Sequence, residues 1–154
     1  MIDALRTEFA LEARVTIGDA LVVGSTPGGL RRVVPITGGS FEGPKLRGRV
    51  LPGGHDRQLF RMDGTLEVEA SYTLEVEDGC LVVITNRGLW RGSPEVGARL
   101  MQGESVDPSE YYFRTRAELE APAGSPHAWL SKSIFVGTAA PEKALVVVRL
   151  FAVL

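Results

Sequence analysis

Four side chains in this sequence could perform catalytic chemistry: Asp56, Glu69, Arg114 and His55. His55 stands beside Asp56 after a pair of glycines, and an imidazole with an unperturbed pKa of about 6.5 suits proton transfer near neutral pH. Asp56 or Glu69 would act as a carboxylate base, and Arg114 would stabilise a developing oxyanion. The set predicts acid–base chemistry on a small organic molecule, at a site in the mouth or lumen of a barrel.

Aromatic residues and the second histidine complete the predicted site. Trp129 would form an aromatic wall, and Tyr112 and His127 would also contact the substrate. Tyr112 and Arg114 fall on the same face of a predicted strand, because side chains two positions apart point the same way. An arginine beside an aromatic ring can orient a carboxylate or an enolate.

Each candidate also has a purely structural interpretation. Asp56 can cap the glycine turn and leave His55 as a solvated loop residue. Glu69 shares its strand face with other glutamates and with hydroxyl residues, which favours exposure to solvent. Arg114 can pair with an acid while the neighbouring aromatic rings fill the core. The residues alone leave these alternatives open.

The sequence offers no spacing typical of a metal site or a nucleophile. His55 and His127 are 72 positions apart, and no paired-cysteine motif is present. The single cysteine, Cys80, lies in an apolar run and is interpreted as a small core residue. A Gly-x-Ser-x-Gly nucleophile elbow is also absent. We therefore expect no bound metal and no cofactor.

The elements that must position these residues are β-strands. Residues 65–77 alternate strictly between apolar and polar side chains over 13 positions, which is the pattern of a half-buried strand. Asp63 and Asp78 are each followed by glycine, and Asp-Gly is a strong signal for a tight hairpin turn. Residues 56–90 are thus predicted to form a three-stranded antiparallel meander.

The rest of the chain continues the same pattern. Eighteen glycines among 154 residues separate short β-prone runs, which is typical of a sandwich or barrel. We predict a single all-β domain over residues 1–154, an antiparallel β-barrel of about nine or ten strands with one or two short helices. The further strands are expected at residues 7–17, 31–37, 45–51, 111–119, 133–137 and 145–153, and the helical segments at 94–101 and 125–131.

Composition limits the partners. The formal net charge of −2 gives no excess of positive charge for nucleic acid. The most apolar run, residues 144–154, is interrupted by Arg149 and is too short to span a bilayer as a helix, and no signal peptide is recognisable. We expect a cytoplasmic protein that binds a small molecule and neither nucleic acid nor a membrane. Because residues 145–153 are apolar on both faces, we also expect a subunit contact and a homodimer.

An ordered series of short motifs runs through most of the chain and resembles the family known as domain of unknown function 3237, from about Phe9 to the end. That resemblance implies a compact antiparallel β-barrel and leaves the biochemical role open. The motifs are Pro35-Ile36-Thr37-Gly38-Gly39, Phe41-Glu42-Gly43, Leu46-Arg47-Gly48, Val50-Leu51-Pro52-Gly53-Gly54, Arg61-Met62-Asp63-Gly64, Asp78-Gly79, Asn86-Arg87-Gly88, Tyr112-Phe113-Arg114-Thr115, Trp129-Leu130 and Phe135-Val136-Gly137.

The sequence departs from the family pattern at three places. Members usually read Gly-Gly-Ala-Asp-Trp, Ala-Arg-Tyr and Trp-Leu-Asn where this chain has His55 and Arg57, Ser71, and Ser131. If those positions line a pocket, the resemblance implies an altered pocket here.

The leading functional prediction is a cofactor-independent isomerase, cyclase, hydratase or lyase acting by proton transfer on an apolar substrate. The alternative is a non-catalytic barrel that binds or carries such a molecule.

Overall fold

The computed structural model describes residues 2–154, and within that range ten strands form one antiparallel sheet. The strands are β1 (Thr7–Ile17), β2 (Leu21–Thr26), β3 (Gly29–Glu42), β4 (Arg47–Val50), β5 (Gly54–Phe60), β6 (Leu66–Val76), β7 (Leu81–Gly92), β8 (Tyr111–Glu120), β9 (Phe135–Glu142) and β10 (Leu145–Val153). The helical segments are α1 (Pro94–Met101) and the short 3-10 turns η1 (Pro108–Glu110) and η2 (Ala128–Lys132).

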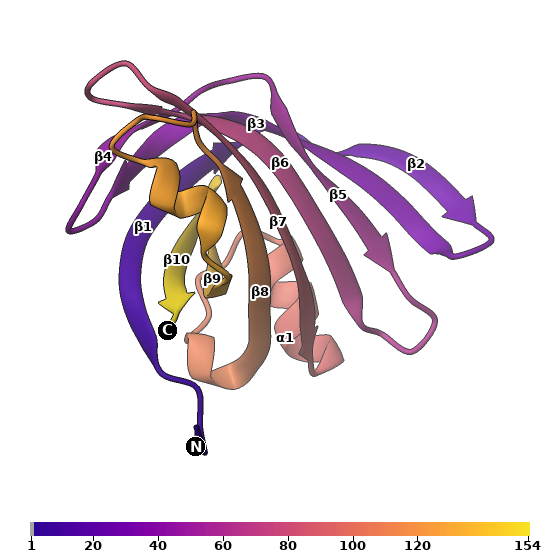
Figure 1. Ribbon diagram of the computed structural model, residues 1–154. Helices are drawn as coiled ribbons and strands as arrows, with labels where there is room; N and C mark the ends of the chain where they lie inside the picture. The colour runs from indigo at the N-terminus through magenta and orange to yellow at the C-terminus, as the bar shows by residue number, and fades with distance from the viewer. Residues whose placement is uncertain (1) are drawn as a thin grey trace.

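The sheet closes on itself. Its order is β1-β10-β9-β8-β7-β6-β4-β3-β2, and β1 also pairs with β3. Strands β4 and β5 both pair with β3 and β6, so they fill successive stretches of the same gap. Strand β2 pairs with β3 outside the ring and projects away from it (Figure 1). This architecture confirms the predicted antiparallel barrel.

Most predicted elements are present. The bounds of β1, β10 and α1 coincide with the predicted ranges, and both Asp-Gly sequences turn between paired strands. The predicted helical segment at 125–131 is only in part helical, as η2. Strand β2 was not predicted. Among residues 2–154, helices fall short of the length and apolarity that crossing a bilayer requires.

The alternation of side chains decides what lies inside the barrel. On β6, Val68, Tyr72 and Leu74 are buried and face inward. The glutamates of this strand face outward, where Glu67 and Glu75 pair with arginines. The period of two that identified this strand therefore also divides core from solvent.

One half of the barrel is solidly packed. The large side chains that are completely buried gather there, and η2 contributes one of them: Leu11, Leu74, Val82, Ile84, Leu130, Phe135 and Leu150. The strands continue into a second half where several inward residues are small or polar, as at Ala70, Asn86 and Thr115. This second half encloses a cavity.

Closure depends on glycine where β1 meets β3. Gly39 pairs with Val15 and has a φ of +130°, in the region that disfavours side chains. A Cβ at this position would also collide with the carbonyl oxygen of Arg14. The β1–β3 register shifts beside this pair, between Thr16 and Ile17. Gly38 and Gly39 thus lie at a β-bulge, which lets the sheet curve.

Candidate functional site

The hollow half of the barrel contains a cavity of about 430 Å³. Its lining is mainly apolar and comes from strands all around the barrel, with α1 at one side; it includes Ile36, Phe60, Val68, Leu100, Phe113 and Val146. An eight-stranded ring is wide enough to hold one small ligand. Small-molecule sites typically occupy an apolar hollow of this kind.

A chain of polar contacts lies along the β3–β5 side of the cavity. Arg32 donates from Nε and Nη2 to Gln58 Oε1, at 3.1 and 2.6 Å. Gln58 Nε2 in turn donates to Asp56 Oδ2 at 3.0 Å, and the backbone N–H of Glu69 donates to Asp56 Oδ1 at 3.1 Å. Both carboxylate oxygens of Asp56 are thus held in place. The register explains the arrangement, because Arg32 is paired with Gln58 across the two strands.

Burial changes the acid–base behaviour of this group. Desolvation raises the pKa of Asp56, and the hydrogen bonds from Gln58 and Glu69 and the charge of Arg32 offset only part of that rise. Desolvation also lowers the pKa of Arg32, against the attraction of Asp56. The pKa of Tyr72 lies well above its usual value, first because of burial and then because of the Asp56 charge. Asp56 therefore exchanges a proton nearer neutral pH than an ordinary aspartate, beside a phenol that stays neutral.

A second group of polar side chains lines the adjoining part of the wall. We call Tyr72, Asn86, Trp90 and Thr115 the polar arc; they come from β6, β7 and β8 and all border the cavity. Each has a buried polar atom without a hydrogen-bond partner among residues 2–154: Tyr72 Oη, Asn86 Oδ1, Trp90 Nε1 and Thr115 Oγ1. The sequence analysis missed these residues, because they lie in runs that look like ordinary strand interior.

The predicted catalytic residues do not share a cavity, which corrects that expectation. Asp56 lines the cavity. His55 is exposed on the other face of β5. Glu69 faces outward, into a surface groove, where it lies 3.6 Å from Arg87. Arg114 is also exposed, on the outside of β8. The reason is the alternation of side chains, which places only Asp56 of these residues inside.

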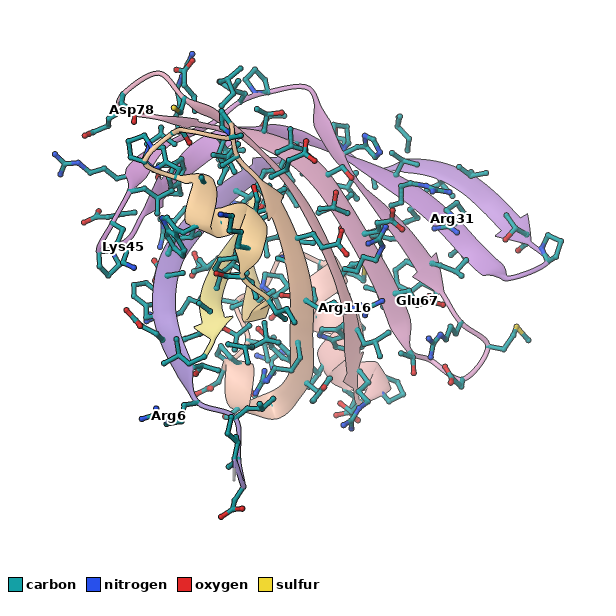
Figure 2. All side chains as sticks on the ribbon, in the orientation of Figure 1. Arg6, Arg31, Lys45, Glu67, Asp78 and Arg116 are labelled. Carbon is teal, nitrogen blue, oxygen red and sulfur yellow. The ribbon has the colours of Figure 1, made fainter. Side chains whose placement is uncertain are left out.

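The same outer surface is visible in Figure 2. Arg31 on β3, Glu67 on β6 and Arg116 on β8 point away from the barrel there and border the groove that receives Glu69. Arg61 Nε donates a hydrogen bond to Glu67 Oε2 at 2.8 Å. The groove is a charged, solvated surface.

The predicted substrate-binding residues also lie outside the cavity. Tyr112 and Arg114 do lie together, with the guanidinium 5.4 Å from the ring centroid, but on the outer face of β8. Trp129 belongs to η2 at the packed end, where its ring lies 6.0 Å from that of Phe135. His127 is buried at the same end. The expectation that these residues contact a ligand in the lumen is corrected accordingly.

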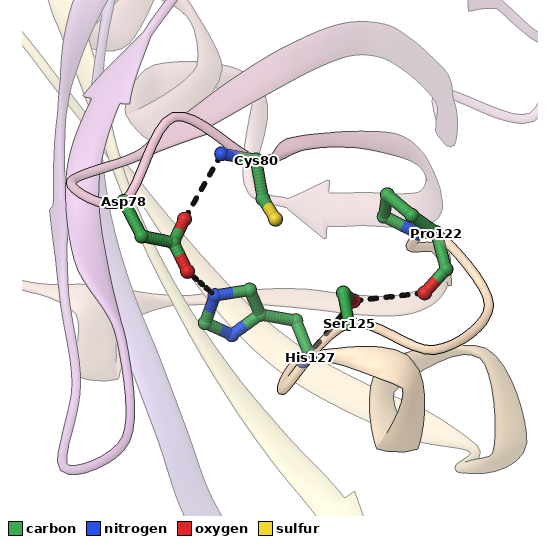
Figure 3. A network of polar contacts seen from close by, with 5 residues as sticks. All are labelled: Asp78, Cys80, Pro122, Ser125 and His127. Carbon is green, nitrogen blue, oxygen red and sulfur yellow. Dashed lines mark hydrogen bonds and ion pairs between the residues drawn. The ribbon is translucent and has the colours of Figure 1, made fainter.

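His127 belongs to a separate network (Figure 3). Its Nε2 lies 2.7 Å from Asp78 Oδ2, while Asp78 Oδ1 accepts from the backbone N–H of Cys80 at 2.9 Å. The hydrogen bond from Cys80 and the contact with His127 lower the pKa of Asp78. Ser125 accepts from the His127 backbone N–H and donates to the Pro122 carbonyl. The contacts fasten the β6–β7 hairpin to the loop before η2.

The three side chains Asp78, Cys80 and His127 are also of types that bind zinc, and their ligand atoms lie within 4.8 Å of one another. Metal binding at His127 Nε2 would leave a proton on Nδ1, which normally needs an acceptor. That buried nitrogen has no partner among residues 2–154. The arrangement fits a structural clamp better than a metal centre.

The departures from the family pattern lie outside the cavity as well. His55 and Arg57 are exposed on the outer face of β5, and Ser71 faces outward between two cavity-lining residues of β6. Ser131 is exposed on η2 and bonds the backbone of Ala121. The cavity lining itself is therefore not altered at these three places.

Known proteins resemble this chain over its whole length. A UPF0311 protein from Rhodopseudomonas palustris is 39% identical over 155 residues, which cover all of both chains. The crystal structure of a protein of unknown function from that organism has a TM-score of 0.94 at 38% identity, covering 99% of this chain and 100% of the other. A β-barrel-like protein from Acinetobacter baumannii has a TM-score of 0.85 at 32% identity, covering 100% and 99%.

A more distant resemblance leads to an enzyme. A hydroalkoxylation enzyme from Penicillium herquei is 30% identical over 78 residues, about half of each chain. The crystal structure of an enzyme from the same organism shares the fold, with a TM-score of 0.73 at 18% identity over 100% and 98% of the two chains. The family model described as protein of unknown function (DUF3237) matches residues 5–153, and the chain belongs to that family.

Proposed function

We propose that this protein is a small-molecule enzyme that transfers protons inside the barrel cavity, with Asp56 as its acid–base group. The observation that supports this most is the environment of Asp56: a carboxylate with a raised pKa, oriented by two hydrogen bonds, at the wall of an apolar cavity. Arg32 holds Gln58 and so positions Asp56 through it.

The reaction class follows from what one carboxyl group can do without a cofactor. Isomerisation, cyclisation, hydration and elimination all need a proton removed at one atom and delivered at another. We favour addition of a substrate hydroxyl across a carbon–carbon double bond, and the name of the Penicillium herquei relative supports that choice. The O–H bond and the π bond of the alkene break, C–O and C–H bonds form, and the proton taken by Asp56 is returned to carbon, so no co-reactant is consumed.

A carrier is the second candidate. The mainly apolar cavity lining would suit a barrel that only binds its ligand. An enzyme and a carrier differ in one respect that can be measured, because only the enzyme changes its ligand.

The single free cysteine, Cys80, agrees with a reducing compartment, and we propose the cytoplasm as the location of this protein.

The experiment tests turnover with and without the carboxylate. The purified protein is incubated with ortho-allylphenols and ortho-prenylphenols, and formation of the isomeric cyclic ethers is followed by NMR. Any molecule that copurifies is identified by mass spectrometry and added to the panel. We expect Asp56→Asn to lower kcat by about 100-fold or more, because general acid–base groups typically contribute that much.

The matched control is Glu69→Gln, which neutralises a carboxylate on the outer face of the neighbouring strand. It should leave kcat unchanged. If the wild type binds these or copurified molecules and transforms none of them, the carrier is correct. If Asp56→Asn turns over at the wild-type rate while remaining folded, Asp56 is not the acid–base group.

A further inference from the structure

The polar arc is unusual because it is both buried and unsatisfied. Tyr72, Asn86, Trp90 and Thr115 are 5%, 4%, 9% and 7% exposed. Buried polar groups in proteins nearly always have a hydrogen-bond partner, and leaving one without a partner destabilises the fold. A set of four such groups in one place therefore calls for an explanation.

Their distribution points to the cavity. Among residues 2–154, six buried side-chain atoms have no partner, and four of the six belong to residues that line this one cavity. The other two, in Tyr111 and His127, do not border it. Unpaired groups scattered through a core would indicate loose packing, whereas groups gathered on one wall indicate a recognition surface.

The sheet register makes the arc continuous. Asn86 is paired with Ala70, two positions before Tyr72 on β6, and Gly88 is paired with Thr115 on β8. Both strands beside Thr115 have a glycine next to it, Gly88 and Gly137. A Cβ at Gly137 would lie 2.7 Å from Thr115 Oγ1, and one at Gly88 would lie 2.7 Å from its Cγ2. Two glycines thus make room for an inward hydroxyl.

The chemistry of the four groups defines what they can bind. Trp90 Nε1 can only donate, so it needs an acceptor oxygen, while Asn86 Oδ1 can only accept, so it needs a hydroxyl or N–H donor. The hydroxyls of Tyr72 and Thr115 can do either. None of the four is a cation, and the guanidinium of Arg32, at the cavity wall, donates to Gln58 and is attracted by the charge of Asp56. An anionic ligand would therefore compete with Asp56 for that positive charge.

We infer that the ligand of the cavity is a neutral, mostly apolar ring compound carrying oxygen substituents, at least one a hydroxyl and one an acceptor such as a carbonyl, which hydrogen-bond to the polar arc. The inference deepens the proposed function by naming its substrate class and shares its cavity. At about 30 Å³ for each water-sized group, 430 Å³ accommodates on the order of 15 non-hydrogen atoms, or two fused rings with substituents.

Three probes of the same shape test the selectivity. Naphthalene, α-naphthol and α-naphthoate are titrated into the protein by calorimetry, with the pH held where α-naphthol is neutral. We expect α-naphthol to bind about tenfold more tightly than naphthalene, because it satisfies at least one buried polar group, and α-naphthoate to bind most weakly. Equal affinities for α-naphthol and naphthalene, or a preference for α-naphthoate, would overturn the inference.

Two near-isosteric substitutions test the residues. Tyr72→Phe and Thr115→Val should each weaken α-naphthol binding by about three- to tenfold and leave naphthalene binding unchanged. In the free protein they should raise the midpoint of thermal unfolding, by about 2–4 °C, because each removes a buried polar atom that has no protein partner. Binding and stability would thus change in opposite directions.

The controls remove the same groups from the outer face: Tyr112→Phe on β8 and Thr85→Val on β7. Neither should alter the affinity ratio of the two probes. A lower midpoint for Tyr72→Phe and Thr115→Val, with an unchanged ratio, would show that these hydroxyls are structural and that the inference is wrong. Asp56→Asn keeps the arc intact, so loss of turnover there tests the proposed function separately from recognition by the arc.

Discussion

At the scale of single residues, Asp56 shows both the strength and the limit of sequence analysis. The sequence marked it as a carboxylate that could do acid–base chemistry, and it lines the cavity. It also marked His55 and Glu69, which the structure places outside. Which face of a strand is inner depends on how the strand pairs, and a polar inner face looks like a polar outer face in sequence.

The sequence also contains a clearer indication of the site, but it can be recognised only when the pairing of the strands is known. Asp56, Gln58 and Phe60 are spaced by two and so share the inner face of β5. Arg32 becomes their neighbour only through the β3–β5 register. The polar arc is harder still, because Tyr72, Asn86 and Thr115 differ from ordinary strand residues only in lacking a partner in the folded protein.

The raised pKa of Asp56 predicts a pH dependence of stability. Between the unfolded pKa of about 3.9 and the higher folded value, the folded protein holds a proton that the unfolded chain has lost. The contribution of Asp56 to the free energy of unfolding is therefore fully present below the unfolded pKa and lost as the pH rises through the folded pKa.

Urea denaturation of the wild type and Asp56→Asn over a series of pH values measures this effect. The difference in unfolding free energy, wild type minus variant, should fall with increasing pH and level off once Asp56 is ionised in the folded state. A difference that grows with pH would mean that Asp56 has a lowered pKa, and the proposed acid–base role would lose its basis.

At the scale of elements, strands with strict alternation and clear turns could be predicted from sequence. The strand predicted at residues 65–77 matches β6 to within one residue at each end, because the alternation of apolar and polar side chains and the Asp-Gly turns indicate the same bounds. Strand β2 was missed for a physical reason: it has no buried face, so Leu21, Val22 and Val23 show no alternation. The segment expected to be helical at 125–131 is helical only in part, as the 3-10 turn η2, which packs on the core through Leu130 and Trp129.

The glycine that closes the barrel allows a direct test at this scale. Gly39→Ala adds a Cβ that both strains a backbone at φ +130° and collides with the Arg14 carbonyl between β1 and β3. Gly53→Ala adds the same group at φ +103° in open space. We expect Gly53→Ala to lower the free energy of unfolding by about 1 kcal/mol, from backbone strain alone.

Gly39→Ala should cost about 2–4 kcal/mol, because overpacking adds to the same strain. Thermal or urea unfolding of the two variants measures both values. Equal losses in the two variants would show that the close approach of β1 and β3 relaxes without cost, and that closure does not depend on Gly39.

At the scale of the whole molecule, the barrel has a packed half and a hollow half along its axis. The packed half holds the completely buried side chains, and the clamp between Asp78 and His127 secures its end. The hollow half contains a half-buried, desolvated carboxylate and buried polar atoms without a partner among residues 2–154, and such groups weaken the fold. A protein can maintain such a cavity because the other half supplies the packing.

The surface of the whole molecule predicts an assembly. Leu21, Val22 and Val23 on β2 are 63%, 66% and 64% exposed. Among residues 2–154, β2 pairs only with β3, which leaves its other edge free. Three consecutive exposed aliphatic residues on an open strand edge favour pairing with another chain. The surface expected from sequence, the outside of β10, is less available, because Val147 and Phe151 are half-buried and Arg149 pairs with Glu12.

We therefore propose a homodimer whose contact is the projecting β2 strand, paired antiparallel with its copy across a two-fold axis. Light scattering at micromolar concentration should give the mass of a dimer, and the double substitution Val22→Lys with Val23→Lys should shift it to the monomer. Ile134→Lys introduces one lysine at a residue that is 73% exposed next to β9, and it should leave the dimer intact. A monomeric wild type would contradict the assembly, and disruption by Ile134→Lys alone would move the contact to the β9–β10 surface.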